Sequence, residues 1–189
     1  IFAHRVSWSV LFIVLILLYK SKLQAFVQAL RVGKNWLYVI PPTVFISINW
    51  LTYIWSVNSG YVIEASLGYY INPLVLTLLG GIFLKERLTR IQWIGMAFAG
   101  VGVLMKTIMY GRIPIVASIL AVSFAIYGLL KKQSKFDGLT GLGFETIIVG
   151  IPSVFYLVFV EASGSGISGN LPPSFWLLIA ISGVVTAVP

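Results

Sequence analysis

The chain has 189 residues, of which 59% are hydrophobic and 10% are charged, and its mean hydropathy is +0.99. A globular domain carries about a quarter charged residues to solvate its surface, so this composition excludes an ordinary soluble domain and indicates a protein whose solvent is largely lipid. The net charge of +8 resides in short basic clusters between apolar segments, a pattern typical of membrane topology and not of nucleic-acid binding.

Seven apolar segments come close to the roughly 20 residues that a helix needs to cross about 30 Å of hydrocarbon. We predict that all are helices, because an isolated strand in lipid would leave its backbone unpaired. The fold class is therefore an all-α, polytopic bundle of transmembrane helices. The chain lacks an initiator Met and stops within an apolar segment, so we expect it to be a fragment of a longer protein. The predicted helices cover residues 2–19, 36–57, 61–84, 91–110, 113–131, 139–160 and 174–189, the last being truncated.

The connection between the first two predicted spans, "KSKLQAFVQALRVGK" at 20–34, has its own helical pattern. Leu23, Phe26, Val27 and Leu30 recur at i, i+3, i+4 and i+7, with basic residues around them. We predict a short amphipathic helix that lies on the cytoplasmic face of the membrane. A binding helix for a calmodulin-type partner is the alternative interpretation.

The basic residues predict the orientation. Ten of the 13 Lys and Arg residues fall in the connections 20–34, 85–90 and 131–135, which lie on one side of the predicted bundle. The opposite side has Arg5, Lys106 and Arg112, so the three basic loops are predicted to be cytoplasmic and the protein to lie in the cell inner membrane.

Enzyme motifs are missing from the chain. A single His excludes two-His metal sites and a conventional His-dependent triad within it, and the absence of Cys excludes a thiolate ligand or nucleophile. The Gly-Ser-Gly at 164–166 lies in a loop and lacks the strand–turn–helix context of a nucleophile elbow. We predict no enzyme, no cofactor and no metal site.

Polar residues inside the predicted spans carry more information. Asn49, Thr52, Tyr53 and Ser56 fall at i, i+3, i+4 and i+7 and form one stripe on the span 36–57. Such a stripe must face protein or a water-filled cavity, because hydrocarbon offers it no hydrogen-bond partner. Two interpretations stand side by side: the lining of a cavity, and interhelical hydrogen bonds that hold the bundle together.

The next span places Glu64, Gly68 and Asn72 on one face by their spacing of four. Glu64 lies in the first turn, where the positive end of the helix dipole favours an acid, or where a cation or proton site would open to the outside. Pro73 gives the carbonyl of Tyr69 no N–H partner, so we predict a bend at mid-membrane depth, a feature that recurs at transporter binding sites.

One further acid is predicted to lie inside the membrane. Glu145 stands about two turns into the span 139–160, with Pro152 two turns deeper. An acid at that depth needs a basic or hydrogen-bonding partner, which marks it as a possible functional residue.

The stretch "EASLGYYINPLVLTLLGGIFLKERLTRIQWIGMAFAGVGVL" (64–104) resembles EamA-type transporters of the drug/metabolite superfamily. The shared pattern is a mid-helix Pro, here Pro73, an acid at the inner end, here Glu86, and a following Gly-rich helix. Together with "INWLTYIWSVNSG" (48–60) and "AHRVSWS" (3–9), this sequence resembles the RarD branch of that family.

The resemblance implies ten helices in two inverted five-helix repeats. Residues 1–111 would be the first repeat without its first helix, and 112–189 the start of the second. The family's central cavity is lined by its third and fourth helices and their repeat partners, and Pro73 would be a bend or gating element there. Carried over to this chain, the cavity-lining positions are Asn49, Tyr53, Ser56, Glu64, Tyr69 and Asn72.

The function that we predict is a bacterial inner-membrane permease that moves a small metabolite or drug-like solute by alternating access. The alternative is a non-transporting structural or assembly subunit, in which the polar stripes serve only as interhelical hydrogen bonds. The predicted partners are the solute and the lipid bilayer, with no nucleic acid. The sequence leaves the substrate, the direction of transport, the coupling ion and the oligomeric state open.

Overall fold

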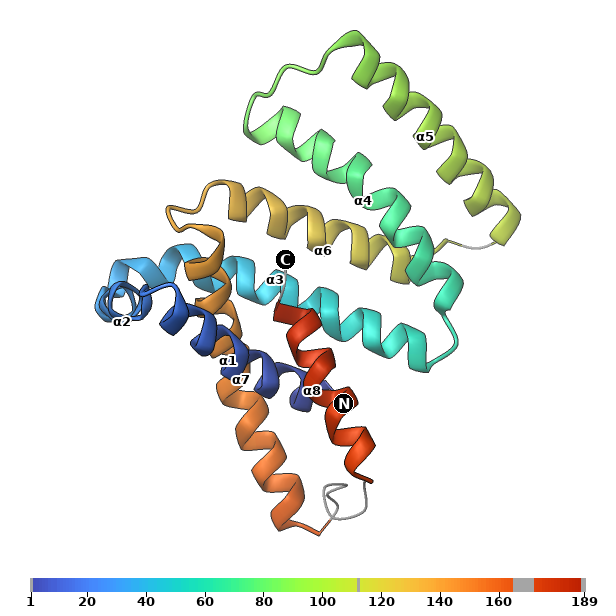
Figure 1. Cartoon of the computed structure of the whole chain (residues 1–189). Helices are drawn as coiled ribbons and strands as arrows, with labels where there is room; N and C mark the ends of the chain where they lie inside the picture. The colour runs from blue at the N-terminus through green and yellow to red at the C-terminus, as the bar shows by residue number, and fades with distance from the viewer. Residues whose placement is uncertain (1, 112, 165–171, 188–189) are drawn as a thin grey trace. The chain divides into compact units, whose positions relative to one another are not determined.

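The structure, a computed structural model, describes residues 2–111, 113–164 and 172–187. Every regular element in these ranges is an α-helix, which confirms the predicted all-α membrane class. Six of the helices, α1 and α3 to α7, are long and apolar enough to cross a membrane, and α8 is a shorter apolar helix. The elements are α1 (Phe2–Tyr19), α2 (Leu23–Arg31), α3 (Gly33–Asn58), α4 (Val62–Phe83), α5 (Arg90–Tyr110), α6 (Ile115–Lys132), α7 (Gly138–Ala162) and α8 (Pro173–Ala187) (Figure 1).

The predicted helices correspond to these elements closely, and the largest difference is at the start of α3. The predicted span begins at 36, whereas α3 begins at Gly33, so that Val32 alone separates it from α2. The first turn of α3 caps the preceding helix: the Asn35 amide donates to the Ala29 carbonyl at 2.8 Å and the Trp36 indole to the Leu30 carbonyl at 3.1 Å. These bonds satisfy carbonyls that the end of a helix leaves without a partner.

The chain divides into two compact units. One consists of 1–43 and 134–189 and the other of 44–133, so that α3 begins in the first unit and ends in the second. The packing within each unit is described separately below.

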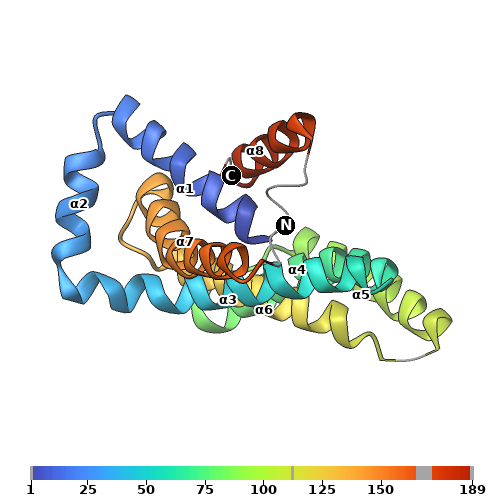
Figure 2. The ribbon, with the colours of Figure 1, turned by 90° about the horizontal axis from the view of Figure 1, so that it is seen from below.

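In the first unit, α1 packs against α7 and α8, and Figure 2 shows it between them. Small residues let the helices approach: a Cβ on Gly150 would collide with Val10, and one on Gly183 with Trp8. The Ser9 hydroxyl donates to the Gly183 carbonyl at 2.8 Å. Close approach with a hydrogen bond to backbone is how helices associate in lipid, where no hydrophobic force draws them together.

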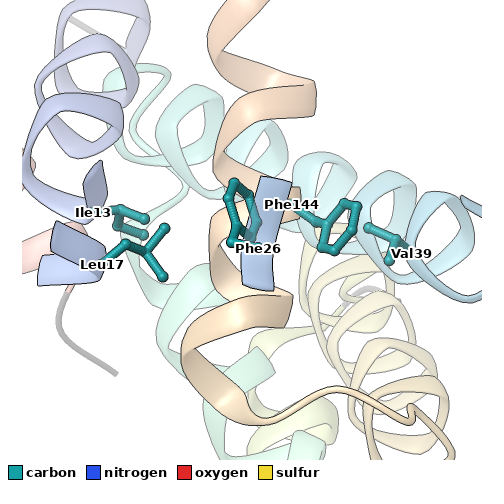
Figure 3. Close-up of a cluster of buried hydrophobic side chains, with 5 residues drawn as sticks. All are labelled: Ile13, Leu17, Phe26, Val39 and Phe144. Atoms are coloured by element: carbon teal, nitrogen blue, oxygen red, sulfur yellow. The ribbon is translucent and has the colours of Figure 1, made fainter. Parts of the chain in front are cut away.

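A hydrophobic cluster also joins α1 and α7 to α2 and to the first part of α3. The side chains of Ile13, Leu17, Phe26, Val39 and Phe144, from α1, α2, α3 and α7, point toward one another (Figure 3). Phe144 is fully buried, and its ring lies 5.2 Å from that of Phe26 in an edge-to-face arrangement. Phe26 of α2 is buried in this cluster and Leu23 and Leu30 pack against it, whereas Val27 is 38% exposed.

An ion pair ties the start of α2 to the start of α7. Lys22 Nζ lies 2.8 Å from Asp137 Oδ2, and this hydrogen bond, followed by one from Thr140, holds the pKa of the Asp137 carboxyl below its usual value. Because the folded pKa is depressed, the stabilisation is present above the ordinary carboxyl pKa and is lost as the pH falls through the folded value. The side chains are 47% and 49% exposed, so water screens the pair and its contribution is small.

In the second unit, α4 packs against α6 on one side and α5 on the other (Figure 1). Ala65 of α4 forms a small buried cluster with Val116 and Leu120 of α6. At the other end of the unit, Glu86 pairs with Lys132, which ties the α4–α5 connection to the end of α6. Contacts with α6 therefore fix the start of α4 and the connection that follows its end.

Replacing the buried ring of Phe144 tests the hydrophobic cluster. Phe144→Ala in the full-length protein is expected to lower the free energy of unfolding by about 3 kcal/mol, because it leaves a cavity where four helices meet. Phe155→Ala, on the same helix but at a position 73% exposed, is the matched control and is expected to change little. Thermal unfolding in detergent measures both, and equal losses in the two variants would contradict the packing described.

Candidate functional site

The polar face of α4 packs against α6. Glu64, Gly68 and Asn72 share the face that their spacing predicts, and Gly68 is its point of closest approach. A Cβ added to Gly68 would lie 3.0 Å from Leu120 Cβ and 3.1 Å from the Ala117 carbonyl oxygen. The absent side chain therefore sets the distance between the two helices and brings the polar residues above and below it against protein.

Glu64 is buried, with 4% of its surface exposed. Its Oε1 accepts a hydrogen bond from the Tyr110 hydroxyl at 2.8 Å, and its Oε2 accepts one from the Val116 backbone N–H at 3.0 Å. The carboxylate thus links the start of α4 to the end of α5 and the start of α6.

Asn49 connects α3 to α6. Its side-chain amide nitrogen donates to the Leu120 carbonyl at 2.8 Å and to Ser123 Oγ at 3.1 Å. Of the two interpretations of the polar stripe, this position shows the interhelical hydrogen bond. The Leu120 carbonyl also accepts from the Ser123 hydroxyl at 3.2 Å, so Asn49 joins a hydrogen-bonded pair that already exists on α6.

The other stripe residues divide between burial and surface. Ser56 is fully buried and donates to the Tyr53 carbonyl at 2.7 Å, so its hydroxyl is satisfied within α3. The rings of Tyr53 and Tyr69 meet edge to face at 5.8 Å, and both are partly exposed. The structure thus brings the predicted aromatic residues of α3 and α4 together.

Asn72 borders a small hollow. Its Oδ1 is buried and has no hydrogen-bond partner among the described residues. The space beside it measures about 10 Å³ and is lined by Asn49, Gly68, Tyr69, Asn72, Leu120 and Phe124. That volume is about the size needed to hold one water molecule, and a water there would supply the missing donor.

Two larger hollows flank Glu64. One, of about 360 Å³, lies between α4 and α5 and contains one basic residue, Lys106; the other, of about 670 Å³, lies between α3, α4 and α6. The first is lined by Val62, Ile63, Glu64, Ser66, Leu67, Tyr70, Lys106, Met109 and Tyr110. The second is lined by Leu51, Thr52, Trp55, Tyr61, Glu64, Ile113, Ile115, Val116 and Ile119.

Two predicted residues stand apart from this group. Pro73 lies within α4, which continues through it to Phe83, and the bend at this position stays a prediction. Glu145 belongs to the other compact unit, where it is buried on α7 with 4% of its surface exposed. It is therefore not among the residues that the second unit brings together.

Sequence reasoning missed three residues at this site. Tyr110 is the phenol that holds Glu64, and Trp55 and Tyr61 line the larger hollow. All three lie at or near helix ends on the side of the bundle where α4 begins, and aromatic residues at such ends are a signal that could have singled them out.

The described residues contain no group of three or more His, Cys, Asp or Glu placed to hold a metal ion. The described residues of the second unit offer hydrogen bonding, aromatic contact and the ionisable side chains of Glu64 and Lys106.

A model of the EamA-like transporter family matches residues 3–108, which is more than half of the chain. The chain belongs to the EamA-like transporter family. The resemblance seen in the residues 64–104 is thereby confirmed, and α1 to α5 lie within the matched segment or at its edge. Glu64, Gly68 and Asn72 are therefore residues of an EamA-like segment.

The similar proteins place this EamA-like chain in the RarD branch. It is 43% identical to "Uncharacterized transporter YojE" of Bacillus subtilis, 40% identical to "Protein RarD" of Streptomyces exfoliatus and 39% identical to "Protein RarD" of Salmonella typhi, in each case over 100% of the chain. The chain spans 64%, 60% and 64% of the length of these relatives. No solved structure was found to match it.

A methyl group at position 68 tests the contact between α4 and α6. Gly68→Ala is expected to lower the free energy of unfolding by about 1–3 kcal/mol, because the new Cβ meets Leu120 and the Ala117 backbone. Gly100→Ala on α5 is the matched control: no atom lies within 4 Å of its Cβ, so the better helix propensity of Ala leaves stability equal or slightly higher. Thermal unfolding in detergent measures both, and a neutral Gly68→Ala would contradict the close approach.

Proposed function

We propose that the full-length protein containing this chain is a permease of the bacterial plasma membrane that moves a small metabolite or drug-like solute by alternating access. One observation carries the proposal: a buried acid, Glu64, stands within an apolar bundle and borders two hollows of about 360 and 670 Å³. Acids inside membrane segments are costly and mostly functional. Membership of a transporter family and the "transporter" in the name of a similar protein support the same function.

The proposed architecture follows from the family. We infer that 1–111 is a first repeat that lacks its first helix and that 112–189 is the start of a second, inverted repeat, within a ten-helix protein. The family model's match to 3–108 supports the first of these bounds.

The proposed solute pathway follows the polar face of α4. Glu64 and Asn72 are its central groups, because one is a buried acid and the other has a buried oxygen available to accept a hydrogen bond. Pro73 is proposed as the gating bend beside them, and Glu145 as a second intramembrane acid. The remaining members of the proposed lining are Asn49, Tyr53, Ser56 and Tyr69.

A second candidate function is a non-transporting structural or assembly subunit. The bonds from Asn49 to Leu120 and Ser123 favour it, because they show polar groups holding α3 to α6. In that case the same face of α4 would serve packing, and a loss of Asn72 would affect folding and not flux.

Flux through the full-length protein separates the two functions. A strain in which the gene is deleted is first compared with the wild type across a broad metabolite panel, which identifies the solute by its changed uptake or efflux. Asn72→Ala is then expected to fold normally and to lose at least about tenfold in flux, since one well-placed hydrogen bond to solute is worth about 1.5 kcal/mol. Thr107→Ala, which removes a hydroxyl bonded to the Val103 carbonyl within α5, is the control and is expected to keep its flux.

Two results would contradict transport through this face. An unchanged metabolite panel in the deletion strain would argue against a permease. Normal flux with impaired folding in Asn72→Ala would favour the structural subunit.

The proposed orientation puts the basic loops 20–34, 85–90 and 131–135 in the cytoplasm. Because the chain contains no Cys, single cysteines can report their side of the membrane once any in the rest of the protein are replaced. In intact cells, Ser59→Cys is expected to react with a membrane-impermeant maleimide, and Gln133→Cys only after the cells are opened. Both positions are exposed, so the reverse labelling pattern would overturn the orientation.

A further inference from the structure

Two lysines of the first unit lie at the start of α3. Lys135 Nζ is 4.6 Å from the centroid of the Tyr38 ring, within the distance at which a cation is attracted to an aromatic face. Lys34 precedes Tyr38 by four residues in α3, so these two side chains share a face of the helix. Both lysines are exposed, and Tyr38 is 41% exposed. Two positive charges therefore gather on one patch of the surface.

The backbone beside each lysine is anchored to the buried ring of Phe144 (Figure 3). Trp36, two residues after Lys34, meets this ring edge to face at a centroid distance of 5.8 Å. Phe136, the neighbour of Lys135, lies 5.2 Å from the same ring. Because a site on fixed backbone has less to order when it binds, this arrangement favours a ligand that contacts both lysines.

The acids of the first unit leave these two charges unpaired. Asp137 pairs with Lys22 at 2.8 Å, and Glu145 is buried on α7. Glu161 lies in the last turn of α7, whereas the two lysines are near its first turn. Within the described residues neither lysine forms an ion pair, so the patch is expected to attract an anion.

The face of α3 that begins with Lys34 continues as an exposed apolar surface. Leu37 and Pro41 follow Lys34 at i+3 and i+7, and both are exposed, Leu37 to 75%. The helix is long and apolar enough to cross a membrane, so its first turn is expected at the membrane surface and the next turns within the lipid. Cations at the surface with apolar side chains below them match the phosphate and the acyl chain of a phospholipid.

We propose that this surface binds an anionic phospholipid, with the phosphate diester at the ammonium groups of Lys34 and Lys135 and an acyl chain along Leu37 and Pro41. Lysine binds phosphate as a point charge. A zwitterionic headgroup brings a cation that the two lysines repel, and a water-soluble phosphate has no chain to place against α3. The site goes beyond the proposed transport function and does not depend on it.

Photo-crosslinking of the full-length protein in phosphatidylcholine nanodiscs tests this assignment. A small fraction of phosphatidylglycerol or phosphatidylcholine carries a diazirine in its acyl chain, and the yield at the peptide spanning 34–41, measured against lipid fraction, gives an apparent affinity. The wild type is expected to prefer phosphatidylglycerol at least about tenfold, since it has two lysines at the headgroup. Free sn-glycerol 3-phosphate is expected to leave the yield unchanged.

Lys34→Gln and Lys135→Gln are each expected to bind phosphatidylglycerol about fivefold more weakly, which corresponds to about 1 kcal/mol. Lys135→Arg keeps the charge and is expected to bind within about twofold of the wild type. Lys85→Gln removes an equally exposed lysine from the α4–α5 connection and is the matched control, with no change expected. If Lys135→Gln unfolds at a lower temperature than the wild type, the comparison of Lys34→Gln with Lys85→Gln decides the matter.

Three results would overturn the assignment. Equal crosslinking by the two lipids would show that the headgroup charge is not recognised. Equal losses in Lys34→Gln and Lys85→Gln would show an effect of net charge and no site. Competition by sn-glycerol 3-phosphate would show a site for small phosphates that does not need the lipid chain.

Discussion

The Glu64 carboxylate is the interaction on which the second compact unit depends. By accepting from the Tyr110 hydroxyl and from the Val116 N–H, it joins the ends of three helices at one point. The residues between those helices, from Gly111 to Pro114, connect α5 to α6 and leave the first N–H groups of α6 without partners in their own helix. An acid at this point satisfies one of these groups and lies near the positive end of two helix dipoles, those of α4 and α6, which offsets part of the cost of its burial.

The same face of α4 has to pack and to remain polar, and Gly68 makes the two compatible. Without a side chain at 68, the backbones of α4 and α6 come close enough for the neighbouring turns to make specific contacts. Asn49 then reaches α6 from α3, and Asn72 keeps a buried oxygen with no partner among the described residues. A buried acceptor without a donor costs about 1–3 kcal/mol, so this oxygen is expected to take its donor from a molecule in the adjacent hollow, which is about the size of one water. This asymmetry between Asn49 and Asn72 is the reason to propose that the face serves a solute as well as the fold.

The helices could be predicted from the sequence because membrane thickness fixes the length of an apolar span, and caps such as Thr89 and Gly111 mark its ends. The spacing of Glu64, Gly68 and Asn72 likewise predicts a shared face. It does not predict what that face meets, since Leu120 and Ser123 lie more than 70 residues from Asn49 and only the tertiary fold brings them within hydrogen-bonding distance. Tyr110 was missed for the same reason: a single aromatic residue at a helix end has no periodicity, and its role depends on an acid 46 residues away.

The central claim, that the polar face of α4 opens to a solute pathway, is tested most directly by the access of water-soluble thiol reagents to position 72. With no other cysteine present in the full-length protein, Asn72→Cys in membranes should react with a charged methanethiosulfonate reagent, and the transported solute should slow that reaction. Leu78→Cys, on the same helix at a position 44% exposed, should react slowly and without regard to solute, because it lies among the apolar residues of the second half of α4. A cysteine at 72 as unreactive as the one at 78, with or without solute, would contradict the account.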